Sequence, residues 1–95
     1  MRLQYTRLNN MVKKYHEEGL TCYGDITYNG KTLTQLGWRY KPDSRRHYIL
    51  FDREKGKYAL ARDSMYENSI VIYTFWKRYS DFKKDLHHLL EANSH

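Results

Sequence analysis

Two strand-forming segments joined by a glycine-containing turn constrain the fold of this chain more than any other feature. His47–Phe51 is rich in residue types that favour strands, and Tyr58–Ala61 follows after the connection Asp52–Lys57. A type I turn that ends on a left-handed Gly56 fits this connection, because glycine accepts a positive φ without a Cβ clash. The two segments therefore predict a β-hairpin.

The length of the connection also predicts the register of this hairpin. If Asp52 faces Lys57, the pairs that follow are Phe51 with Tyr58, Ile49 with Leu60 and His47 with Arg62. Side chains alternate between the two faces of a strand, which predicts a core face of Ile49, Phe51, Tyr58 and Leu60. The opposite face carries Tyr48, Leu50, Ala59 and Ala61. The two alanines leave room for a helix, so the sequence leaves open which face of the hairpin is exposed to solvent.

The preceding half of the chain predicts a helix and a second hairpin. Apolar residues recur at helical spacing over residues 2–18, and Gly19 is placed to cap the helix in a left-handed conformation. Asn29-Gly30 is the strongest hairpin signal in the chain and joins predicted strands at 20–28 and 31–40. The expected pairs are Tyr28 with Lys31, Ile26 with Leu33 and Tyr23 with Leu36. Gly24 and Gly37 nearly face each other, which indicates a bulge or a close backbone approach. Residues 33–36 could instead form one helical turn.

The last third predicts one more strand and a final helix. Residues 70–76 form the most apolar strand, which we expect at the centre of the sheet with both faces covered. Ser80 is suited to N-cap the helix that follows. The fold class is therefore α+β: a small single domain, residues 1–95, with an antiparallel sheet of about five strands flanked by N- and C-terminal helices. We expect burial of Leu8, Val12, Ile49, Phe51, Leu60, Ile72, Phe75, Phe82, Leu86 and Leu89.

The charge balance narrows the class of partner. The 95 residues carry a formal net charge of +6 and have a pI of about 9.5, which favours nucleic acid, anionic lipid or an acidic protein surface. A solvated basic surface is the alternative reading. Cys22 is the only cysteine, which excludes an internal disulfide and a cysteine metal cage. With no apolar run of transmembrane length and no signal-peptide core, we expect a cytoplasmic protein.

The candidate catalytic and metal-binding residues are the histidines, the cysteine and the carboxylates. His87 and His88 are adjacent on the last predicted helix, so they point about 100° apart and cannot share a metal as i, i+4 neighbours would. Cys22 lies in mid-strand, without a glycine turn or helix N-terminus to lower its pKa. The carboxylates are scattered among turns and basic residues. The sequence therefore predicts a non-enzymatic protein without a metal or another cofactor.

The stretch from Trp38 to Arg62 mixes cations with planar side chains, which a phosphate backbone with stackable bases requires. The leading hypothesis is a nucleic-acid-binding module for DNA or RNA, with cations neutralising phosphates and rings stacking on bases. The alternative is a small protein-binding inhibitor or adaptor, of the kind carried by phages and mobile elements, that uses the same surface or a strand edge. The predicted site comprises Trp38, Arg39, Tyr40, Lys41, Arg45, Arg46, Tyr48, Arg53, Lys55 and Lys57.

A third reading comes from a local resemblance. The segment Trp76–Phe82, with the sequence WKRYSDF, resembles the strand-to-helix signature of phosphoinositide-binding PX domains. The resemblance implies that Arg78 contacts a ring phosphate and that Tyr79 packs on the inositol ring, so the protein would bind anionic lipid. The match covers seven of 95 residues. Leu86 comes one residue later than in that family, and Pro42 is the only proline, so the family's proline-rich membrane loop is absent.

Overall fold

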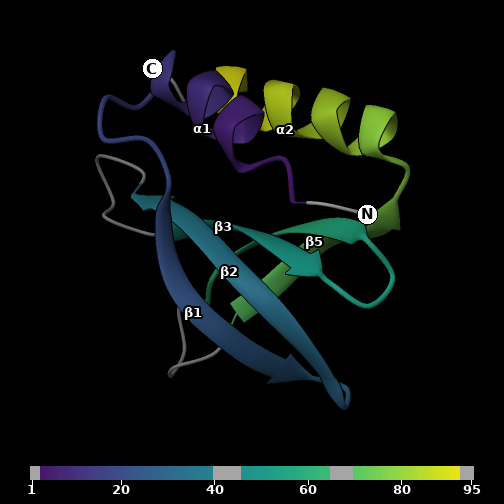
Figure 1. Ribbon diagram of the computed structural model, residues 1–95. Helices are drawn as coiled ribbons and strands as arrows, with labels where there is room; N and C mark the ends of the chain where they lie inside the picture. Colours follow the sequence, from purple (N-terminus) through teal and green to yellow (C-terminus); the bar gives the residue numbers. More distant parts are fainter. Residues whose placement is uncertain (1–2, 40–45, 65–69, 93–95) are drawn as a thin grey trace.

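The computed structural model describes residues 3–39, 46–64 and 70–92. Figure 1 shows a twisted sheet with both helices on one of its faces. The chain is an α+β protein, as predicted, with an antiparallel five-stranded sheet and one helix near each terminus. Its elements in chain order are α1 (Tyr5–Lys13), β1 (Thr21–Tyr28), β2 (Lys31–Arg39), β3 (Arg46–Asp52), β4 (Lys57–Asp63), β5 (Ile70–Lys77) and α2 (Tyr79–Ala92).

Each strand pairs with the next along the chain, so β3 is central and β1 and β5 are the edges. The register predicted for the β3–β4 hairpin is confirmed at every pair, from Asp52 with Lys57 to His47 with Arg62. Gly56 has the predicted positive φ, 66°. The turn is held by Asp52, whose Oδ1 accepts the backbone N–H groups of Glu54 and Lys55 at 3.0 and 3.2 Å.

The β1–β2 hairpin follows the predicted register near its turn and departs from it farther away. Ile26 faces Leu33 as expected, but Leu36 faces Cys22 rather than Tyr23, because a bulge lies between Cys22 and Gly24. Of the two alternatives predicted at Gly24, the bulge is confirmed, although Gly37 faces Thr21 rather than Gly24. The helical turn considered for residues 33–36 is absent, since they lie in β2.

The helices cover the face that was predicted as the core. A cluster of buried side chains joins α1, α2 and the middle strands, and includes Leu8, Ile49, Phe51, Leu60 and Phe82. Helix α1 is shorter than the predicted 2–18. The chain folds back after Lys13, with the Leu20 N–H donating to Asn9 Oδ1 at 2.8 Å. Gly19, φ 70°, allows this return, since a Cβ there would clash with Asn9.

The opposite face of the middle strands is also buried, although both helices lie on the other side (Figure 1). Its floor consists of Leu33, Tyr48, Leu50, Ala59 and Ala61, and partly buried residues of β1 and β5 pack against it. The small alanines let side chains from the flanking strands lean inward over the floor. Neither face of the middle strands is therefore fully exposed to solvent. Both faces are buried at their centres and more exposed at their edges.

Strand β5 corrects the prediction that the most apolar strand is central. It lies at the sheet edge beside β4, and Val71 and Tyr73 remain 38% and 45% exposed. Its apolar composition serves the second cluster instead, through Ile70, Ile72 and Trp76. Ile72 is only partly buried, and the side chain of Phe75 lies outside the described residues.

Helix α2 begins two residues earlier than predicted. It starts at Tyr79, so Ser80 lies in the first turn and is not the N-cap. The ring of Tyr79 packs against the rings of Tyr58 and Phe82, at centroid distances of 5.5 and 6.5 Å, which draws this residue into the helix. Phe82 and Leu86 are buried as predicted, and Leu89 is partly buried.

Candidate functional site

The sheet face opposite the helices gathers rings and cations at its two ends. We call it the open face, and define its rim by Tyr23, Tyr28, Lys31, Arg46 and Trp76. Alternation along β2 places Lys31 on the same face as the buried Leu33. Lys31 and Arg39 stand eight residues apart on β2, and Arg39 pairs with Arg46, so roughly 26 Å separates the two ends.

One end joins the β1–β2 turn, the β3–β4 turn and the last residues of β5. The Lys31 ammonium lies 5.8 Å from the centroid of the Trp76 ring. The neighbouring Lys55 side chain lowers the pKa of Lys31, and Asp52 and Glu54 act in the opposite direction. The Lys31 ammonium therefore lies beside a partly buried indole and interacts with the charged side chains of the β3–β4 turn.

The other end is built on β1, β3 and β4. The Arg46 guanidinium lies 4.9 Å from the centroid of the Tyr23 ring, which in turn meets the Tyr48 ring edge to face at 5.8 Å. Gly37 makes room for both rings, because a Cβ there would lie 2.7 Å from Tyr23 and 2.9 Å from Tyr48. The Asp63 carboxylate offsets part of the positive charge of Arg46. It also accepts a hydrogen bond from the Tyr48 hydroxyl at 2.7 Å.

Burial contributes most to raising the pKa of Tyr48 to about 12, and its hydrogen bond to Asp63 adds to the effect. The Tyr48 phenol is thus a neutral internal group. Its hydroxyl donates a hydrogen bond to Asp63, and its ring packs against the ring of Tyr23.

A third cation and ring pair lies outside the open face. Arg62 lies 5.7 Å from the centroid of Tyr73 on the edge strand β5. A row of rings continues inward from there, with Tyr73 against His47 at 6.2 Å, His47 stacked on Trp38 at 5.5 Å, and Trp38 against His16 at 6.3 Å. Burial lowers the pKa of His16.

The predicted stacking roles of Trp38 and Tyr48 are wrong. Trp38 is 3% exposed and belongs to the core under the helices, and Tyr48 is 6% exposed. Neither ring offers a free face to a base. Trp38 is buried against His47, on which it stacks, and His16. Tyr48 is buried because Tyr23 of β1 and Asp63 of β4 contact it.

The predicted cations fall into three groups. Arg53, Lys55 and Lys57 are exposed at the β3–β4 turn, and Arg46 is half-buried at the opposite end of the open face. The backbone of Arg39 is in β2, but its side chain lies outside the described residues, as do Tyr40, Lys41 and Arg45.

Sequence reasoning missed four residues of the rim, namely Tyr23, Tyr28, Lys31 and Trp76. The Asn29-Gly30 hairpin already predicts that Tyr28 faces Lys31, so these two were within reach of sequence analysis. Tyr23 reaches the open face only through the bulge. The contact between Lys31 and Trp76 depends on the order of the strands in the sheet, since it joins β2 to β5.

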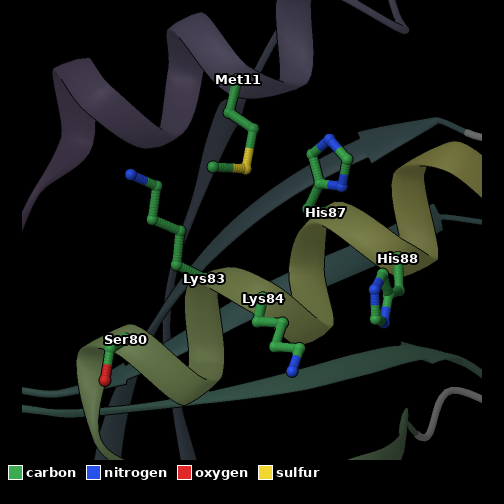
Figure 2. A pocket seen from close by; sticks show the side chains of 6 residues that line it. All are labelled: Met11, Ser80, Lys83, Lys84, His87 and His88. Carbon is green, nitrogen blue, oxygen red and sulfur yellow. The ribbon is translucent and has the colours of Figure 1, made fainter.

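A shallow depression of about 270 Å³ lies between α1 and α2, away from the open face. Figure 2 shows Met11 above it and five α2 side chains around it. His87 and His88 point in different directions (Figure 2), with ring centroids 6.5 Å apart. His87 Nε2 lies 3.2 Å from the Tyr15 hydroxyl. The lining residues are Met11, Ser80, Lys83, Lys84, His87 and His88.

The segment that resembles PX domains does form a strand followed by a helix, since β5 ends at Lys77 and α2 begins at Tyr79. Lys77 Nζ pairs with Asp85 of α2 at 2.9 Å. Tyr79 packs on Tyr58 and Phe82 of the core, and Arg78 is exposed.

Residues 3–39, 46–64 and 70–92 hold no group of three histidine, cysteine, aspartate or glutamate side chains suited to a metal ion. Within the same residues, no helix is long and apolar enough to cross a membrane. No protein-family model, curated protein or solved structure matches the chain.

Proposed function

We propose that the protein is a non-enzymatic nucleic-acid-binding module that uses the open face and the adjoining β3–β4 turn. The observation that carries this proposal is the pairing of a cation with a ring at each end of one sheet face, Lys31 with Trp76 and Arg46 with Tyr23. Cations supply the electrostatic attraction to phosphate, and rings supply stacking surfaces for bases.

The Tyr23 ring also restrains a cation. A lysine or arginine that binds phosphate loses side-chain freedom, which opposes binding. Placing Arg46 over the Tyr23 ring removes part of that freedom before the ligand arrives. The β3–β4 turn adds Arg53, Lys55 and Lys57, all exposed, on a loop that Asp52 holds in shape. The net charge of +6 acts in the same direction at longer range.

The test is a titration of labelled single-stranded and duplex oligonucleotides, followed by fluorescence anisotropy at several salt concentrations. Binding should weaken by about 0.7–0.9 log units per log unit of salt for each phosphate neutralised. Arg53→Ala combined with Lys57→Ala should lower this salt slope by up to the amount expected for about two phosphate contacts. The matched control, Lys13→Ala with Lys14→Ala on the opposite side of the molecule, should leave it unchanged. A wild-type protein without affinity at low salt would refute the proposal.

A second candidate function, binding of a protein partner, is favoured by the exposed apolar groups of edge strand β5. An edge strand presents backbone groups to which another strand can add, and Val71 and Tyr73 would contact that strand. Val71→Lys should then weaken binding of a protein partner recovered from host lysate. The same substitution should leave nucleic-acid affinity intact, because Val71 is not on the rim of the open face.

A further inference from the structure

We propose that the end of the open face formed by Tyr28, Lys31, Lys55 and Trp76 is a subsite for an unpaired nucleotide. The base lies against Trp76, and its phosphate lies between Lys31 and Lys55. This inference rests on the proposed function and specifies its ligand as single-stranded nucleic acid.

The first support is that four separate elements converge at this place. In a flat sheet, β2 and β5 would be three strand spacings apart, roughly 14 Å. The Lys31 ammonium nevertheless lies 5.8 Å from the Trp76 ring centroid. The Lys31 and Trp76 side chains therefore reach toward each other over β3 and β4, which places a ring on one side and ammonium groups on the other.

The second support is the repulsion between the ammonium groups of Lys31 and Lys55. The neighbouring Lys55 side chain is the largest cause of the lowered pKa of Lys31, and Asp52 and Glu54 act in the opposite direction, so these carboxylates offset only part of the opposition between the two lysine charges. An anion between them would relieve that opposition. Phosphate suits this position because each ammonium donates hydrogen bonds and each phosphate oxygen accepts them.

Lys31 also indicates how a base would enter. Its ammonium lies over the Trp76 ring, and Trp76 also packs against the buried cluster of the open face. An incoming base would take the position over the ring, and the displaced ammonium would move onto the phosphate. A contact between cation and ring is thus exchanged for stacking plus an ion pair.

The geometry selects unpaired bases. In a duplex, the faces of the bases are covered by their neighbours, so Trp76 could meet only backbone and groove edges. In a single strand, every base has a face to stack, which makes this mode tolerant of sequence. The subsite should therefore prefer single strands over duplexes and show little base specificity.

The experiment compares a labelled oligothymidylate of about 16 nucleotides with a mixed duplex, a length at the upper end of known site sizes. Trp76→Ala should weaken binding of the single strand by about 5- to 150-fold, equivalent to about 1–3 kcal/mol per stacked base. Trp76→Phe should retain most of the affinity. Both variants should bind duplex as the wild type does.

The lysine pair has a control of equal charge. Lys31→Ala with Lys55→Ala should reduce the salt slope for the single strand by up to about 1.4 log units, at about 0.7 per lost contact. Lys83→Ala with Lys84→Ala on α2 removes the same charge and should leave the slope unchanged. All four lysines lie on accessible parts of the protein, so these variants keep the test valid if Trp76→Ala unfolds.

Tryptophan fluorescence adds a direct reading of contact. Oligothymidylate should quench the emission of the wild type, and the quenching should be lost in Trp76→Phe, because the remaining Trp38 is 3% exposed in the core. Equal affinity for duplex and single strand, or quenching that survives in Trp76→Phe, would overturn the subsite while leaving nucleic-acid binding in place. Absence of binding to either oligonucleotide would instead refute the proposed function.

Discussion

Replacing Phe82 by alanine tests whether α2 is an integral part of the core. Phe82 is 2% exposed and stacks on Tyr58, with ring centroids 4.7 Å apart and planes inclined by 20°. Truncation of a buried phenylalanine costs about 3–5 kcal/mol through lost burial and the cavity that remains. The stacked pair itself accounts for about 0.5–1.5 kcal/mol beyond burial.

The neighbours of Phe82 argue against a cost at the lower end of this range. Tyr58, on which it stacks, also accepts the Gln4 N–H at 2.9 Å and so ties the segment before α1 to β4. A cavity beside Tyr58 would loosen both terminal elements. We expect a loss of about 4 kcal/mol, a large part of the 5–15 kcal/mol typical of small domains.

Urea denaturation followed by circular dichroism measures this loss. With an m-value of about 2 kcal/mol/M, the midpoint should fall by about 2 M at constant m. The exposed Lys83→Ala on the same helix is the control and should shift the midpoint little. A loss below about 1 kcal/mol for Phe82→Ala would show that α2 does not contribute to the core in the way described.

Three further predictions concern single positions. Gly56→Val should destabilise by about 1 kcal/mol or more, because valine is strained at φ 66°, and thermal melting would show it. Burial lowers the pKa of His16 in the folded state, so the unfolded state binds more protons below about pH 6.5. The free energy of unfolding should therefore fall as pH drops through that value, and His16→Gln should reduce the fall. Since the pKa of Tyr48 is raised to about 12, one late tyrosine in a spectrophotometric titration should vanish in Tyr48→Phe.

The β3–β4 hairpin was predictable in full because its determinants are local. The turn length places Asp52 opposite Lys57, Gly56 accepts the left-handed conformation, and alternation then assigns each side chain to a face. The helical stripe through Phe82 and Leu86 was predictable for the same reason, since a period of 3.6 residues is read within a single segment.

The sheet order and the site depended on contacts that no local pattern contains. The apolar composition of β5 indicated a strand that is buried on both faces. Composition cannot distinguish such a central strand from an edge strand whose apolar side chains pack onto a neighbouring buried cluster. Tyr48 looked like an exposed ring because its burial requires Tyr23, displaced by a bulge, and the space above Gly37. Lys31 and Trp76 meet across two intervening strands.

The central claim is that nucleic acid binds the open face, and a map of amide chemical-shift changes tests it most directly. A single-stranded oligonucleotide added to isotope-labelled protein should shift the resonances of Tyr28, Lys31, Lys55 and Trp76, together with those of the floor strands. Resonances of α2 between Ser80 and His88 should stay in place. Changes confined to α2 or to the segment Lys77–Tyr79, or no changes at low salt, would contradict the account.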